Sequence, residues 1–110
     1  MSFKRQFTPL LLFIILAHGA LAEGDAVWID VRTGLEHAVA NIQGDTRIAH
    51  GDIVEEVTAL YPDRDTDIYL YCQSGGRAGQ AADALAQAGY GNVKNVGGID
   101  DARKARDLTE

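Results

Sequence analysis

The sequence predicts an α/β domain with a three-layer plan, in which helices flank a mainly parallel central sheet. Two observations predict the α/β class. Short apolar, β-rich segments alternate with segments whose apolar residues recur at helical spacing. Polar or glycine-containing turns separate these segments, as in the stretch PDRDTD at residues 62–67. The chain contains no internal repeat or low-complexity tract, so we expect one domain over residues 23–110.

The first half of the domain holds two predicted strands and two predicted helices. The strands lie at residues 26–31 and 46–50, and the helices at residues 33–41 and 52–61. Thr33 is a candidate N-cap of the first helix. Asp52 is the expected N-cap of the second, and Glu55 stands three residues later, at the spacing of a capping box.

The second half repeats the alternation. The predicted strands lie at residues 68–72 and 92–96, and the predicted helices at residues 77–88 and 99–108. Gly89 follows the first of these helices, where a C′ glycine is common. Cys72 ends the strand IYLYC, and α/β sheets bind ligands beyond the carboxyl ends of their strands.

The amino terminus, residues 1–22, has the pattern of an export signal. Two basic residues are its only charges, an apolar block covers residues 10–17, and an A-x-A exit ends at Ala22. A membrane span needs about 20 apolar residues, and this block is shorter. We therefore expect cleavage after Ala22, export of residues 23–110 and no stable membrane insertion afterwards.

Composition excludes several classes of function. Residues 23–110 carry 8 basic and 16 acidic residues, a net charge of −8, which argues against a nucleic-acid partner. The single cysteine cannot form an intramolecular disulfide. The domain has two histidines, His37 and His50, and these with one cysteine give no metal-ligand spacing. We expect no metal, no cofactor and a monomer.

The loop YCQSGGRAGQ carries the candidate chemistry. After Cys72 it runs through Gln73, Ser74, Gly75, Gly76 and Arg77 into the predicted helix. The free N–H groups of a helix start and a glycine-rich turn together form an anion-binding nest. A sulfur at its centre ionises more readily than a free thiol. Arg77 can hold an anionic substrate, while Gln73 and Ser74 can donate hydrogen bonds. The alternative is a buried core cysteine; position, glycines and Arg77 favour a reactive one.

Several segments resemble rhodanese domains, the sulfurtransferases. CQSGGR with the following AGQAADALAQAGY resembles their active loop and helix. WIDVR, NIQGDTRIAHGDI and NVGGI resemble three further signatures, in the same order. With the export signal, the chain is most similar to small periplasmic rhodaneses of the phage-shock type. It departs from the family at Asn41, Asp45 and Ala49, where histidine, alanine and proline are frequent, and its last helix lacks a frequent tryptophan.

The resemblance implies a two-step sulfur transfer through Cys72. The thiolate would take the outer sulfur of an anionic donor such as thiosulfate, and the resulting persulfide would pass it to cyanide or a thiol. A persulfide carrier without turnover is one alternative. Phosphatases of the same fold are another, but their loops place five residues between cysteine and arginine. Here four lie between Cys72 and Arg77, which favours a single sulfur atom.

The Asp30–Arg32 pair and His37 are charged or titratable residues outside the cysteine loop. Asp30 and Arg32 are two residues apart on a strand, so they share one face. We expect them to brace the cysteine loop as a buried network rather than to act as a catalytic pair. His37, next to Glu36 on a short helix, is expected to be solvated.

Overall fold

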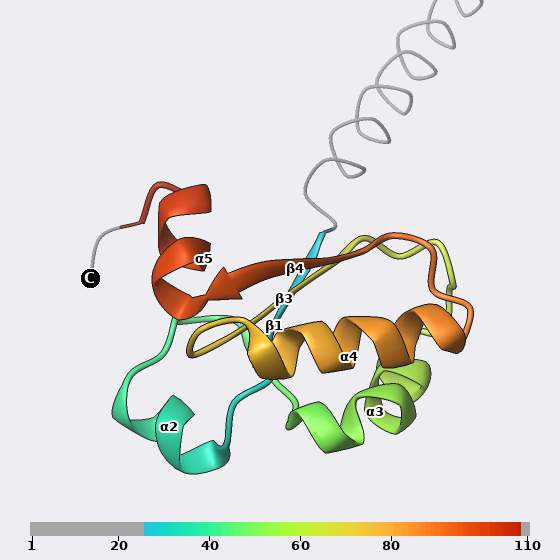
Figure 1. Ribbon diagram of the computed structural model, residues 1–110, viewed down its shortest axis with the longest axis horizontal. Helices are drawn as coiled ribbons and strands as arrows, with labels where there is room; N and C mark the ends of the chain where they lie inside the picture. The colour runs from blue at the N-terminus through green and yellow to red at the C-terminus, as the bar shows by residue number, and fades with distance from the viewer. Residues whose placement is uncertain (1–25, 109–110) are drawn as a thin grey trace, which may run out of the picture.

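The computed structural model describes residues 26–108, which form a four-stranded parallel sheet with helices on both faces (Figure 1). The strands are β1 (Val27–Asp30), β2 (Thr46–Arg47), β3 (Ile68–Cys72) and β4 (Val93–Gly98), in the order β2-β1-β3-β4. All three strand pairings are parallel. The predicted α/β class is confirmed. The predicted signal at residues 1–22 lies outside the described residues.

One face of the sheet packs against the helices α3 (Ile53–Leu60) and α4 (Gly76–Gln87). Both are amphipathic, and they bury Ile53 and Val57 from α3 and Ala78, Ala81 and Leu85 from α4. These side chains meet the apolar residues of β1 and β3, such as Ile29 and Leu70, in the larger core cluster. Within residues 26–108, no helix combines the length and apolar character that crossing a bilayer requires.

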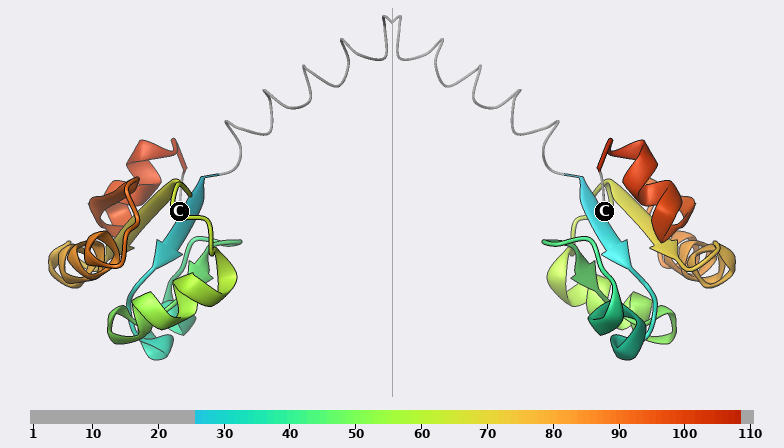
Figure 2. Two further views of the ribbon diagram at one scale, coloured as in Figure 1. Left: turned by 90° about the vertical axis from the view of Figure 1, so that its right-hand side faces the viewer. Right: turned by 90° about the vertical axis from the view of Figure 1, so that its left-hand side faces the viewer.

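The other face is covered by α5 (Ile99–Ala105), as Figure 2 shows. Its Ile99 and Ala102 pack on Tyr71, whose hydroxyl donates a 2.6 Å hydrogen bond to Asp45. Arg106 donates to the same carboxylate at 2.7 Å. Asp45, one of the departures from the family pattern, therefore anchors the end of this helix to the sheet.

The short helix α2 (Gly34–Val39) lies beyond the carboxyl end of β1 (Figure 1). Thr33 is its N-cap, as predicted, and forms a complete capping box with Glu36. The Glu36 N–H donates to Thr33 Oγ1 at 3.1 Å, and the Thr33 N–H donates to Glu36 Oε1 at 2.9 Å. None of the residues of α2 is buried, so polar contacts hold this helix in place.

Three local predictions differ from the structure. The capping box expected at Asp52 is absent: its side chain makes no capping hydrogen bond, because the 3₁₀ helix His50–Asp52 leads straight into α3. The strand expected over residues 46–50 pairs only at Thr46–Arg47. β4 is longer than expected, because Gly97 and Gly98 still pair with β3 after an irregularity in the register.

Candidate active site

The cysteine loop begins where β3 ends and closes where α4 begins. Cys72 is the last residue of β3, and Gly75 is the N-cap of α4. Gly75 has φ of +106°, in the left-handed region that disfavours residues with a Cβ. A Cβ there would also lie 3.3 Å from the Cα of Gly97. The turn after Cys72 therefore depends on a glycine at this position.

The loop places backbone N–H groups around the sulfur. The Gly75 N–H donates to Cys72 Sγ at 2.9 Å. Burial raises the pKa of the Cys72 thiol, but hydrogen bonds from four backbone N–H groups outweigh it and hold the pKa below its usual value. The four groups belong to Ala78, Ser74, Gly75 and Arg77. The thiolate is thus stabilised by the loop and the first turn of α4.

The sulfur lies beneath the surface while most of the loop faces solvent. Cys72 is 1% exposed, whereas Gln73, Ser74 and Gly76 are exposed. Behind the loop, β4 approaches so closely that a Cβ on Gly98 would overlap the carbonyl oxygen of Gln73. Small residues in β4 are therefore part of what shapes the loop.

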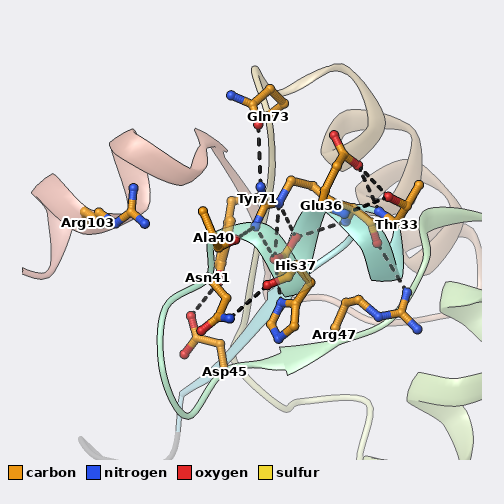
Figure 3. A network of polar contacts seen from close by, with 12 residues as sticks. Thr33, Glu36, His37, Ala40, Asn41, Asp45, Arg47, Tyr71, Gln73 and Arg103 are labelled. Atoms are coloured by element: carbon orange, nitrogen blue, oxygen red, sulfur yellow. Dashed lines mark hydrogen bonds and ion pairs between the residues drawn. The ribbon is translucent and has the colours of Figure 1, made fainter. Parts of the chain in front are cut away.

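A buried ion pair connects the end of β1 to this loop. Asp30 and Arg32 are 0% and 3% exposed, and Arg32 donates through Nε and Nη2 to the Asp30 carboxylate, each at 2.9 Å. The Arg32 N–H donates to Asp30 Oδ1 at 3.0 Å. The guanidinium also donates to the Ala40 carbonyl and reaches Gln73 Oε1 at 3.5 Å (Figure 3). The pair thus connects β1, the end of α2 and the first loop residue, which is the arrangement that the predicted bracing role requires.

His37 belongs to this network, and the expectation that it is solvated is wrong. Its Nδ1 lies 2.9 Å from Asp30 Oδ2, and its side chain is only 26% exposed. Because an ionised carboxylate only accepts hydrogen bonds, Nδ1 carries the proton in this contact. Burial raises the pKa of Asp30, but the hydrogen bonds from Arg32 and His37 outweigh this effect and hold the pKa below its usual value. Asp30 therefore stays ionised although it is buried.

Arg77 forms an ion pair that the sequence reasoning missed. Its Nη1 and Nη2 donate to the two carboxylate oxygens of Glu36, at 2.7 and 3.0 Å. The hydrogen bond from Arg77, followed by that from the Thr33 backbone, lowers the pKa of Glu36 to about 2. An anion that binds Arg77 must therefore share this guanidinium with a carboxylate. The Thr33-x-x-Glu36 spacing could have located Glu36 on α2, but no local pattern shows its contact with Arg77.

A cleft of about 330 Å³ lies between α2 and the loop. Its lining is mostly apolar and comes from Arg32, Leu35, Glu36, Val39, Ala40 and Gln73. Within residues 26–108, no group of three or more His, Cys, Asp or Glu side chains is placed to hold a metal ion. The structure thus brings the predicted loop and the Asp30–Arg32 pair together. It also places Glu36, His37 and the apolar residues of this cleft beside them.

Comparisons with known proteins identify the family. Residues 16–105 match the Rhodanese-like domain family. The chain is 34% identical over 74 residues to thiosulfate sulfurtransferase PspE of Escherichia coli (strain K12), covering 67% of this chain and 71% of that protein. It is 37% identical over 76 residues to a sulfurtransferase of Allochromatium vinosum, covering 68% and 69%.

Solved structures agree with the sequence relatives. A structure described as "rhodanese with anions from E. coli" matches with a TM-score of 0.66 at 33% identity, covering 69% of this chain and 89% of that one. The human single-domain sulfurtransferase TSTD1 matches with a TM-score of 0.62 at 25% identity, covering 80% and 89%. In sequence and in fold, the chain belongs to the rhodanese family.

Proposed function

We propose that the protein is a sulfurtransferase that carries sulfur as a persulfide on Cys72 and takes it from thiosulfate or a similar anionic donor. The observation that supports this most directly is the Gly75 N–H, 2.9 Å from Cys72 Sγ, in a loop that lowers the pKa of the thiol. The sulfurtransferase names of its relatives support the same reaction class.

The reaction needs only one nucleophile. The Cys72 thiolate attacks the outer sulfur of thiosulfate, the bond between the two donor sulfurs breaks, and sulfite leaves with the electron pair. The charge then lies on the terminal sulfur of the persulfide, which the N–H groups of Gly75 and its neighbours stabilise. Cyanide or a thiolate attacks that sulfur and restores the Cys72 thiolate. No oxidant or reductant is consumed.

Loop residues have distinct roles in this proposal. Gln73 and Ser74 are exposed at the rim, where they can donate hydrogen bonds to the donor's oxygens. Gly75 supplies a backbone donor at the sulfur, and Gly76 is exposed in the turn beside it, where its N–H is available to the donor. Arg77 adds a cation that Glu36 partly compensates. Only four residues separate Cys72 from Arg77, which favours a sulfur atom over a tetrahedral phosphate.

Mass spectrometry tests the persulfide directly. Incubation with thiosulfate should leave Cys72 heavier by one sulfur atom, and cyanide should remove that sulfur as thiocyanate. Cys72→Ser is the control and should take up no sulfur. An unmodified Cys72 with no thiocyanate formed would refute the proposal.

The ionisation of Cys72 has a separate test. Free cysteine has a pKa of about 8.5, and the loop N–H groups lower the pKa of Cys72. The rate of alkylation by iodoacetamide should therefore reach half its maximum at a pH below that of free cysteine. A midpoint at or above that of free cysteine would show that the loop does not stabilise the thiolate.

The place of action is part of the proposal. The export signal expected at residues 1–22 would deliver residues 23–110 to the periplasm as a monomer. Amino-terminal sequencing of the protein from a periplasmic fraction should begin at Glu23. An intact amino terminus in the cytoplasmic fraction would contradict this.

A further inference from the structure

Helix α2 directs its apolar side chains to solvent beside the active loop. Leu35 and Val39 are 75% and 78% exposed, more than any other large hydrophobic residue described. They are four residues apart, so they lie on the same side of the helix. Ala40 adjoins them at the helix end. Together they form a continuous apolar wall.

This wall adjoins the loop that follows Cys72. The cleft of about 330 Å³ that it lines is also lined by Gln73, which directly follows Cys72, and by Glu36, which holds Arg77. Pockets for organic ligands begin at about this size and are mostly apolar. Thiosulfate is a small inorganic dianion that uses no apolar wall. The cleft therefore has room for an organic group attached to the sulfur that is transferred.

The ion pairs near the cleft also favour an organic donor over thiosulfate. Arg32 is paired with Asp30 at 2.9 Å, and Arg77 is paired with both oxygens of Glu36. Arg32 and Arg77 thus each already have an anionic partner. A doubly charged donor therefore gains less binding free energy here than it would from an unpaired arginine. A singly charged donor with an apolar substituent depends less on the arginines, so their pairing costs it less binding free energy.

We propose that Leu35, Glu36 and Val39 determine donor specificity, and that they favour organic thiosulfonates, R–SO₂–S⁻ with an apolar R group, over thiosulfate. This inference rests on the proposed persulfide chemistry. The Cys72 thiolate attacks the terminal sulfur, the bond from that sulfur to the sulfonyl group breaks, and the sulfinate R–SO₂⁻ leaves with the electron pair. The negative charge remains on the persulfide, and the organic group occupies the cleft throughout.

Three donors separate charge from apolar contact. Methanethiosulfonate and benzenethiosulfonate carry the same charge and differ in apolar surface, while thiosulfate carries one more negative charge. Burying part of a phenyl ring against the wall should raise kcat/KM for benzenethiosulfonate about tenfold above that for methanethiosulfonate. Equal values for the two in the wild-type protein would overturn the inference.

Substitutions in α2 test whether Leu35 and Val39 set the preference for the donor with more apolar surface. In the double variant Leu35→Ser/Val39→Ser, the ratio of kcat/KM for benzenethiosulfonate to methanethiosulfonate should fall to about one, since the wall is lost. Leu60→Ser is the matched control, because Leu60 is an exposed leucine on α3 outside the cleft, and it should keep the wild-type ratio. A ratio that survives in the double variant would refute the role of the wall.

Glu36 is tested through charge. Glu36→Gln frees the charge of Arg77, so kcat/KM for thiosulfate relative to methanethiosulfonate should rise roughly threefold to tenfold at low salt and less at high salt. Glu56→Gln removes an exposed carboxylate from α3 and should leave that ratio unchanged. An unchanged or lowered ratio in Glu36→Gln would show that Glu36 does not set charge preference.

Binding without turnover gives an independent measurement. Benzenesulfinate, the product left in the cleft, should bind to the Cys72→Ser variant when binding is measured by calorimetry. Adding Leu35→Ser and Val39→Ser to that variant should weaken the binding about tenfold.

A dimer in sedimentation that the two serine substitutions dissociate would overturn the inference, because a second copy of the chain would then cover the wall. No persulfide from any donor would refute the proposed function. Persulfide formation without discrimination among the three would refute only this inference.

Discussion

Replacing Asp30 with asparagine tests whether the buried ion pair supports the fold. Asp30 is fully buried and accepts hydrogen bonds from the Arg32 backbone and guanidinium and from His37. The substitution Asp30→Asn would keep the size of the side chain but remove its charge. The guanidinium of Arg32, itself 3% exposed, would then be a buried cation without an anionic partner at this position.

The expected magnitude follows from that burial. Removing one partner of a buried pair costs about 3–5 kcal/mol. We take about 3 kcal/mol, since asparagine still offers one acceptor oxygen to Arg32. For a domain of this size, each 1 kcal/mol shifts Tm by roughly 4–8 °C, so Tm should fall by at least about 12 °C. Total stabilities are about 5–15 kcal/mol, so the variant should still fold at 25 °C.

Urea unfolding followed by circular dichroism measures this effect. Asp100→Asn is the control, because its carboxylate is 77% exposed in an ion pair with Arg103. That substitution should change the free energy of unfolding by less than about 1 kcal/mol. A loss below about 1 kcal/mol in Asp30→Asn would refute the reasoning, because it would mean that Arg32 does not need the charge of Asp30.

The same pair gives a pH dependence with a defined sign. The pKa of Asp30 is lower in the folded protein than its ordinary value. Its ionised form therefore contributes stability that is complete above the unfolded pKa of about 3.9 and is lost as the pH falls through the folded pKa. The difference in unfolding free energy between wild type and Asp30→Asn should be constant near neutral pH and should shrink below about pH 4. A difference that grows in acid would contradict this sign.

Two further substitutions test other parts of the fold. Tyr71→Phe removes the hydroxyl that donates to the nearly buried Asp45, so the free energy of unfolding measured in urea should fall by about 1–2 kcal/mol. An unchanged value would mean that Arg106 alone satisfies that carboxylate. Gly98→Ala places a methyl group against the Gln73 carbonyl, so it should displace the loop and lower kcat for sulfur transfer at least about tenfold. Gly51→Ala, with open space around it, is the control and should keep the wild-type kcat. A wild-type kcat in Gly98→Ala would contradict the close approach of β4 to the loop.

Much of the fold could be predicted from the sequence because its signals are local. Alternating apolar strands and amphipathic helices specify the α/β class without any knowledge of long-range contacts. The cysteine loop could be located for the same reason, since strand end, glycines and arginine are contiguous. The details that differ are helix starts and strand lengths. Asp52 holds the N-cap position of α3, as predicted, but its side chain makes no capping hydrogen bond because the preceding 3₁₀ turn already continues into the helix.

The partners of charged side chains could not be predicted in the same way. Glu36 and Arg77 are 41 residues apart, and a carboxylate on a short exposed helix has many potential partners in the sequence. The sequence alone predicts a solvated His37, because nothing local shows that α2 turns it toward the end of β1. Its contact with Asp30 follows from where α2 lies, which the tertiary fold decides.

In the proposed persulfide cycle, the depth of the sulfur would limit which molecules can react at each stage. Resting Cys72 is 1% exposed, so we expect it to admit the slender terminal atom of a donor and to exclude a bulky thiol or disulfide. Adding one sulfur moves the reactive atom outward by about 2 Å, the length of an S–S bond. We therefore expect the loaded enzyme to admit acceptors that the empty enzyme excludes. Such selection by size would protect the resting thiol from forming mixed disulfides while leaving the persulfide sulfur available to acceptors.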